Sequence, residues 1–223
     1  DETGVKEISG AKLQIIDKET NEVIEEWIST EESHKVNYLV EGKEYIMKEI
    51  TAPYGYEIAE EITFVMGDGI KVTMQDNPIL KTLQLTKLDK ETDEVIKSNF
   101  TFGLYIDKEC TQLIQQVDSN AKKGTITFKD LRYGEYFIKE ISAPNGYVLS
   151  DKVIKVKIND KGVFVAGKNI EEKDSVYSFT FYNKPIPKIQ TGNEMNYIIL
   201  FGSVVISLIG IITGIVILKR NKK

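Results

Sequence analysis

The sequence predicts an all-β protein with two tandem units, followed by one apolar helix that spans a membrane. Short runs of alternating apolar and polar residues dominate the chain and are separated by turn-forming clusters, which is typical of a β-sandwich or barrel. A thirteen-residue stretch occurs twice, 91 positions apart. Near the C-terminus, 22 consecutive residues carry no charge, which is long enough to cross a bilayer as a helix.

The duplicated stretch reads EYIMKEITAPYGY from Glu44 and EYFIKEISAPNGY from Glu135, with nine of thirteen positions identical. The spacing indicates two similar units of roughly 90 to 100 residues, each large enough for its own core. We place the boundary at the sequence DNPILK, so that the units are residues 1–79 and 80–185. Each unit then closes on a proline.

The alternating runs give the individual strands, and proline and glycine in APYGY and APNGY predict turns between them. One short stretch, CTQLIQQV at 110–117, instead has the apolar spacing of a soluble helix. The predicted strands are 12–17, 44–50, 62–66, 71–76, 81–89, 100–107, 124–128, 135–141, 152–158 and 177–183.

Composition excludes several function classes. The net charge of −5 repels phosphate backbones and provides no basic patch for nucleic acid. A single cysteine, Cys110, allows no disulfide within the chain and no cysteine-based metal site. The single histidine, His34, lies in a predicted loop, and the sequence has no nucleophile elbow, metal-ligand spacing or phosphate loop. We therefore expect no enzymatic turnover, no cofactor and no metal.

Polar residues appear at the inward-facing positions of three strands in the second unit. Side chains at alternate positions share one face of a strand. Lys87, Glu140 and Asn183 each follow two apolar residues at alternate positions. In the first unit the same pattern gives Glu49 and Asp76, and Asp76 shares with Asn183 a place two residues before a proline. A buried charge needs a partner, so these side chains are candidates for a shared site.

Three interpretations explain this pattern. Lys87 and Glu140 form a buried ion pair with Asn183 as a hydrogen-bond partner, or the strand ends fray and all three side chains are hydrated. In the third, a dry environment lowers the pKa of the lysine and raises that of the glutamate. The neutral amine of Lys87 then attacks the amide carbon of Asn183 while Glu140 relays protons, which forms an isopeptide bond and releases ammonia.

The sequences LQLTKLDKET, YGEYFIKEISAPNGY and FTFYNKP occur in this order within 81–185. They resemble the lysine, glutamate and asparagine boxes of the Cna protein B-type (SpaA-like) domain of Gram-positive surface proteins. The resemblance implies an inverse immunoglobulin-like sandwich with a self-formed Lys–Asn or Lys–Asp isopeptide bond. It further implies that Lys87 is the nucleophile, Asn183 the acceptor and Glu140 the catalytic acid/base.

The first unit resembles the same family through GAKLQIIDKETNEVIEEW, EYIMKEITAPYGYE and VTMQDNP. The resemblance implies that Glu49 is its catalytic acid and Asp76 its acceptor. The stretch from Asp1 to Gly4 aligns with Asp89 to Asp93 of the second unit, so that the matching lysine would precede Asp1 by two residues. We therefore expect the first unit to lack its first strand and to be unable to close its own bond.

The C-terminal region combines a polar linker at 186–196, the apolar span at 197–218 and a basic tail, KRNKK, at 219–223. Basic residues favour the cytoplasmic side, so we expect the tail to be cytoplasmic and residues 1–196 to lie outside the membrane.

The same region resembles a cell-wall sorting signal, in which a Pro–Thr–Gly motif precedes an apolar span and a basic tail. The motif here is IPKIQTG, with three residues between Pro187 and Thr191 where the usual pattern has one. The resemblance implies transient binding of a sortase, cleavage between Thr191 and Gly192, and attachment of Thr191 to peptidoglycan or to a pilin subunit.

These observations predict the structural stalk or anchor region of a cell-wall surface protein, related to adhesins or pilins and stiffened by self-formed isopeptide bonds. Two alternatives stay open at this point. The two units could form a ligand-binding adhesin module, with a host ligand that the sequence does not specify, or the protein could be retained in the membrane without sortase processing.

Overall fold

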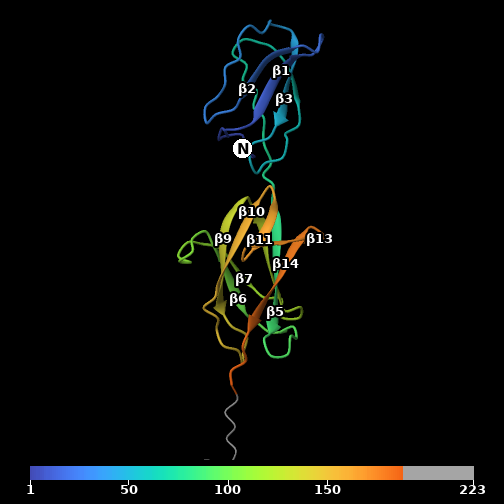
Figure 1. The fold of residues 1–223 in the computed structure, drawn as a ribbon. Coiled ribbons are helices and arrows are strands. Elements are labelled where there is room, and N and C mark those ends of the chain that lie inside the picture. Colours follow the sequence, from blue (N-terminus) through green and yellow to red (C-terminus); the bar gives the residue numbers. More distant parts are fainter. Residues whose placement is uncertain (188–223) are drawn as a thin grey trace, which may run out of the picture. The chain divides into compact units, whose positions relative to one another are not determined.

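The computed structural model describes residues 1–187, which form strands, turns and extended segments with no α-helix among them (Figure 1). The predicted all-β fold is confirmed for this part of the chain. No helix suited to crossing a membrane is found in the described residues. The predicted span at 197–218 and the sorting residues Thr191 and Gly192 lie outside the described region, and Pro187 is its last, exposed residue.

The first repeat, residues 1–79, forms a single antiparallel sheet with the strand order β2-β1-β3-β4. Alternate residues of β1 are buried, as its pattern of apolar residues predicts. The strands are β1 (Lys12–Asp17), β2 (Val23–Ile28), β3 (Glu44–Thr51) and β4 (Ile62–Val65).

The second repeat, residues 80–185, is a sandwich of two sheets with the orders β12-β11-β10-β9-β6-β7 and β13-β14-β5-β8. Its first and long last strands, β5 and β14, lie side by side and run parallel. The strands are β5 (Lys81–Asp89), β6 (Thr101–Tyr105), β7 (Leu113–Asp118), β8 (Thr125–Leu131), β9 (Gly134–Ser142), β10 (Val153–Asn159), β11 (Gly162–Val165), β12 (Lys168–Ile170), β13 (Glu172–Lys173) and β14 (Val176–Asn183).

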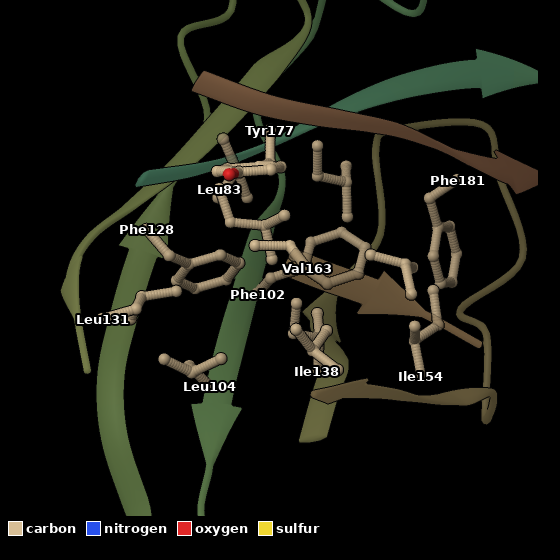
Figure 2. Packing of buried hydrophobic residues seen from close by; sticks show 14 of the residues in the cluster. Leu83, Phe102, Leu104, Phe128, Leu131, Ile138, Ile154, Val163, Tyr177 and Phe181 are labelled. Atoms are coloured by element: carbon tan, nitrogen blue, oxygen red, sulfur yellow. The ribbon is translucent and has the colours of Figure 1, made fainter. Parts of the chain in front are cut away.

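The core of the second repeat lies between its two sheets (Figure 2). Leu83 and Leu85 face inward from β5 at alternate positions and are buried. From the opposite sheet, the ring of Phe102 meets that of Phe181 edge-on, with centroids 5.0 Å apart and an interplanar angle of 79°. This is a favourable geometry for two aromatic rings, and it joins the faces of the two sheets.

The sheet of the first repeat matches one sheet of the second. The order β2-β1-β3-β4 corresponds to β7-β6-β9-β10, with the same antiparallel pairing throughout. Leu13 of β1 lies opposite Glu49. Phe102 of β6 likewise lies opposite Glu140. Within the described residues, the first repeat therefore has no counterpart of the sheet that contains β5, β8 and β14.

Two of the local predictions are wrong. The segment 71–76 is not a strand, because the matching strand β14 is held by hydrogen bonds to β5 and the first repeat has no strand in that place. The helix-like spacing at 110–117 belongs to the edge strand β7, which pairs with β6. Its apolar residues Leu113 and Ile114 are exposed, and Val117 packs against the core. The helix-like spacing of the apolar residues at 110–117 is therefore a coincidence.

The predicted turns at APYGY and APNGY, within the duplicated stretches, are confirmed. Gly55 and Gly146 have φ angles of +87° and +85°, in the region where a Cβ atom is unfavourable. These turns direct the chain into isolated bridges between Tyr56 and Pro78 in the first repeat and between Tyr147 and Pro185 in the second.

The packing of the second repeat predicts the effect of truncating a core side chain. Leu104 is wholly buried, so Leu104→Ala should lower the free energy of unfolding by about 2–5 kcal/mol through lost contacts and a cavity. Ile106, two residues further along, is 52% exposed, and Ile106→Ala should change it by only about 0.5 kcal/mol. Denaturant unfolding followed by circular dichroism measures both, and equal effects would contradict this placement of the core.

Candidate functional site

The structure brings Lys87, Glu140 and Asn183 together inside the second repeat. Lys87 lies on β5 and Asn183 at the end of the adjacent strand β14, while Glu140 reaches them from β9 in the opposite sheet. Their relative exposures are 0%, 2% and 1%. The interpretation that the strand ends are frayed and hydrated is therefore wrong, and the ion pair and the isopeptide chemistry stay open.

The Glu140 carboxylate connects the other two side chains. Lys87 Nζ donates a hydrogen bond to Glu140 Oε1, and Asn183 Nδ2 lies 3.0 Å from the same oxygen and 2.9 Å from Oε2. The main-chain N–H of Ser150 donates to Oε2 at 2.8 Å, and Asn183 Nδ2 also donates to the carbonyl of Val148 at 3.0 Å. Asn183 Oδ1 has no hydrogen-bond partner in the described part of the chain.

Three aromatic rings surround the amine of Lys87. Its Nζ lies 4.2 Å from the ring centroid of Phe181, 4.5 Å from that of Phe102 and 5.3 Å from that of Phe100. Burial lowers the pKa of Lys87 to about 8, although the hydrogen bond to Glu140 acts in the opposite direction. The amine therefore loses its proton more readily than an exposed lysine does, and only the deprotonated amine is a nucleophile.

The end of β5 is held by a hydrogen bond that involves none of Lys87, Glu140 and Asn183. The hydroxyl of Tyr147 donates to Asp89 Oδ2 at 2.8 Å, and Asp89 Oδ1 accepts from the main-chain N–H groups of Glu91 and Thr92. The hydrogen bond from the Tyr147 hydroxyl is the main cause of the lowered pKa of Asp89. It ties the turn after β9 to the strand that carries Lys87.

The first repeat contains the matching carboxyl groups without a lysine. Glu49 Oε2 accepts a hydrogen bond from the main-chain N–H of Ala59 at 2.6 Å, as Glu140 does from Ser150 in the second repeat. Glu49 and Asp76 are 3% and 8% exposed, and no lysine among residues 1–187 forms a salt bridge with either. Burial is the main cause that raises the pKa of both carboxyl groups.

Sequence reasoning missed several parts of the site. The parity of β14 already placed Phe181 on the same face as Asn183, so this aromatic neighbour could have been found. The bonds from Ser150 and to Val148 use main-chain atoms, which carry no signature in the side-chain pattern. The tyrosine of the duplicated APxGY sequence was visible, but nothing local indicated that Tyr147 bonds to Asp89.

Comparison with known protein families identifies the fold of both repeats. The model of the SpaA prealbumin-like fold domain matches residues 1–78 and again residues 81–171. The chain belongs to the SpaA prealbumin-like family. The two SpaA matches include Lys87 and Glu140, and the second match ends before Asn183.

Solved structures show the same SpaA fold. The Bacillus anthracis TIE protein is 21% identical with a TM-score of 0.55, and the match covers 80% of this chain but only 31% of that protein. A C-terminal fragment of the pilus adhesin SpaC from Lactobacillus rhamnosus GG is 15% identical with a TM-score of 0.51, covering 85% of this chain and 92% of the fragment. A search of curated proteins finds no match. The chain thus shares its fold with surface proteins of Gram-positive bacteria.

The buried carboxyl groups predict that the stability of the first repeat depends on pH. A raised pKa in the folded state means that Glu49 stabilises the fold below its ordinary value of 4.5, and that this contribution is lost as the pH rises through the raised value. Glu49→Gln should therefore weaken the loss of stability as the pH rises above 4.5. Trp27, the one tryptophan, lies on β2, so its fluorescence follows thermal unfolding of this repeat.

The exposed residue Glu60 provides the control for this measurement. Glu60→Gln removes the same charge without removing a buried carboxyl group, and its pH profile should match that of the unmodified chain. Identical pH profiles for Glu49→Gln and Glu60→Gln would show that the Glu49 carboxyl group does not destabilise the fold at neutral pH.

Proposed function

We propose that this chain is the stalk or anchor region of a Gram-positive cell-surface protein of the pilin or adhesin kind, and that an isopeptide bond between Lys87 and Asn183 stiffens its second repeat. One observation carries the proposal: both nitrogen atoms contact the same carboxylate oxygen of Glu140 in a site without solvent exposure. Family membership and the shared fold support the same function.

The proposed reaction begins with transfer of a proton from the Lys87 ammonium to Glu140, which gives a neutral amine and a carboxylic acid. Turning the amide of Asn183 by half a rotation would direct Oδ1 toward that acid, which then donates a hydrogen bond and polarises the carbonyl. Nζ attacks Cγ, the new Nζ–Cγ bond forms, and the Cγ–Nδ2 bond breaks. Nδ2 takes up the proton that the attacking amine loses and leaves as ammonia, while Glu140 keeps the proton that it received from the ammonium.

The position of this bond suits a stalk. Lys87 and Asn183 lie on the first strand and the long last strand of the repeat, which are adjacent and parallel. A covalent bond between them would carry a pulling force past the hydrogen bonds of the sheet. It would also close a loop of roughly 100 residues, which by analogy with a disulfide removes about 4.7 kcal/mol of denatured-state entropy. The reaction occurs once in each molecule, so we propose no enzymatic turnover.

The buried carboxyl groups of the first repeat extend the proposal. Asp76 is the proposed acceptor and Glu49 the proposed acid, in a reaction with a lysine that would release water where Asn183 releases ammonia. The matching hydrogen bonds to Glu49 and Glu140 support this assignment.

The C-terminal sequence supports attachment to the cell surface. We propose that the membrane holds the apolar span at 197–218 until a sortase cleaves after Thr191 and joins it to peptidoglycan or to a pilin subunit. Residues 1–191 would then face the outside of the cell, anchored to the wall.

Mass spectrometry tests the bond in the second repeat. The folded chain should weigh one ammonia less than its sequence requires, and digestion should yield one branched peptide that joins the Lys87 and Asn183 segments. Glu140→Ala should have the full mass calculated from its sequence, because the substitution removes the proton relay. Lys87→Ala should also have its full calculated mass, because the substitution removes the nucleophile. Both variants should unfold at a lower temperature than the unmodified chain, because the denatured chain regains its loop entropy.

Glu135 is the matched control, since it lies on the same strand as Glu140 but forms an exposed ion pair with Lys155. Glu135→Ala should keep the missing ammonia. A simple buried ion pair gives a different pattern: full mass in the unmodified chain, with Glu140→Ala costing about 3–5 kcal/mol through the stranded ammonium. Full mass in a well-folded chain would overturn the isopeptide proposal.

Enzymatic digestion of the cell wall tests the anchor. Cells that express the full protein should release its extracellular part when peptidoglycan is digested, and Thr191→Ala should abolish this release because the acyl donor of the sortase reaction is changed. Release that requires detergent in both cases would mean that the apolar span is retained and that the wall attachment is wrong.

A further inference from the structure

A short segment that follows β9 holds two of the three proposed reactive side chains through its main chain. The segment, residues 147–150, belongs to no strand. The carbonyl of Val148 accepts a hydrogen bond from Asn183 Nδ2 at 3.0 Å. The N–H of Ser150 donates a hydrogen bond to Glu140 Oε2 at 2.8 Å. The segment therefore fixes the acceptor amide and the acid relative to each other.

The main-chain contact with the acid does not depend on β5. In the first repeat, where residues 1–187 contain no counterpart of the sheet with β5, the N–H of Ala59 donates to Glu49 Oε2 at 2.6 Å. This is the same contact that Ser150 makes in the second repeat. The segment after the glutamate strand thus takes its place on its own sheet without the lysine strand, and a separate contact must connect it to β5.

A single side chain makes that connection. The hydroxyl of Tyr147 donates to Asp89 Oδ2 at 2.8 Å, and within residues 1–187 this is the only hydrogen bond between the segment and β5. Asp89 Oδ1 accepts from the N–H groups of Glu91 at 2.7 Å and Thr92 at 3.1 Å. Both oxygens of this carboxylate, which is only 9% exposed, are therefore occupied, and the side chain is held in one orientation.

Asp89 lies where a shift of β5 would affect the proposed reaction most directly. It is the last residue of β5 and faces inward two residues beyond Lys87. In the parallel pair of β5 with β14, Asp89 lies opposite Asn183 and Lys87 lies opposite Phe181. The amine must therefore reach diagonally to an amide two residues further along the neighbouring strand. Any movement of the end of β5 along β14 changes the distance between the reacting atoms.

The Tyr147 hydroxyl acts here as a hydrogen-bond donor and not as an acid. The bond to Asp89 is the main cause that raises the pKa of Tyr147 above its ordinary value of 10, and it also lowers the pKa of Asp89. The proton therefore stays on the tyrosine and the charge on the aspartate at neutral pH. Within the described residues the hydroxyl forms no hydrogen bond with Lys87, Glu140 or Asn183. Any effect that it has on their reaction must act through the position of β5.

We propose that Tyr147 is a positioning residue for the crosslink of the second repeat. By holding Asp89, its hydroxyl fixes the end of β5 against the segment that holds the acceptor amide and the acid. Without the hydroxyl, the end of β5 can shift against β14, and the reacting atoms of Lys87 and Asn183 spend less time within reach of each other. This role rests on the isopeptide bond proposed above, because it concerns the rate at which that bond forms.

The rate at which ammonia is lost tests this role. The full 223-residue chain is made by cell-free translation in detergent, samples are quenched in acid at intervals, and intact mass gives the crosslinked fraction. Tyr147→Phe keeps the ring and should slow the reaction by about tenfold to a hundredfold, which is the scale expected for a small displacement of reacting groups. The factor should be the same below and above the pKa of Lys87, about 8, because the hydroxyl transfers no proton.

Tyr136 on β9 provides the matched control. Its hydroxyl donates to the carbonyl of Arg132 at 2.9 Å and forms no hydrogen bond with β5 within the described chain. Tyr136→Phe therefore removes a comparable hydrogen bond from the same repeat and should leave the rate of ammonia loss unchanged. Equal slowing in Tyr136→Phe and Tyr147→Phe would show a general loss of stability and would overturn the positioning role.

Variants of Asp89 test whether the two side chains act through one bond. Asp89→Asn keeps a polar atom that can bond to the Tyr147 hydroxyl, so it should react faster than Asp89→Ala. Adding Asp89→Ala to Tyr147→Phe should slow the reaction by less than the product of the two separate effects, because both substitutions remove the same hydrogen bond. Equal rates for Asp89→Asn and Asp89→Ala, or fully multiplicative effects in the double variant, would contradict the role of this bond.

The outcomes for the unmodified chain separate the two proposals. Full mass in the unmodified chain would overturn the isopeptide bond, and the role of Tyr147 with it. Loss of ammonia from the unmodified chain, at a rate that Tyr147→Phe does not change, would overturn the role of Tyr147 alone. A slowing in Tyr147→Phe that differs below and above the pKa of Lys87 would also overturn it, because the hydroxyl would then act on protonation and not on position.

Discussion

The buried amine of Lys87 is the constraint on which the site of the second repeat depends. A charged amine in a dry core costs several kcal/mol unless a carboxylate and further hydrogen bonds compensate for the lost water. Glu140 provides the carboxylate from the opposite sheet, and Asn183 completes its hydrogen bonds from the neighbouring strand. The three side chains therefore join the first strand, the long last strand and the facing sheet at one point. The same arrangement brings the amine of Lys87 and the amide of Asn183 to one carboxylate, and the proposed isopeptide bond rests on this geometry.

The two repeats show what one strand contributes to this fold. Where β5 is present, its neighbours are ordered as strands and the carboxylate of Glu140 is paired. In the first repeat, the matching segments 34–40 and 69–76 have no strand structure, and Glu49 Oε1 has no hydrogen-bond partner within residues 1–187. In the second repeat, β5 thus has two roles: it supplies hydrogen bonds to both neighbouring strands, and it carries Lys87, whose charge balances that of the buried Glu140.

Prediction from sequence succeeded where a local rule was sufficient. Alternation placed Lys87, Glu140 and Asn183 on inward faces, and burial of all three confirms that placement. The turns at Gly55 and Gly146 followed from the need for a positive φ. It failed at 71–76, where alternation was correct but no strand within residues 1–187 pairs with the segment, and at 110–117, where the helix-like spacing belongs to an edge strand. A strand is stable only when neighbouring strands pair with it. A local sequence pattern does not show which segments will be its neighbours.

By itself, the sequence determined the all-β class, the duplication and the polar residues that face inward, because side-chain alternation and repeat spacing are properties of the chain alone. Only the tertiary structure decided which of those residues meet. The parallel pairing of β5 with β14 and the approach of β9 from the opposite sheet depend on contacts between residues far apart in the sequence. So do the aromatic rings around Lys87 and the lowered pKa of its amine, because desolvation is a property of the packed core and not of any single segment.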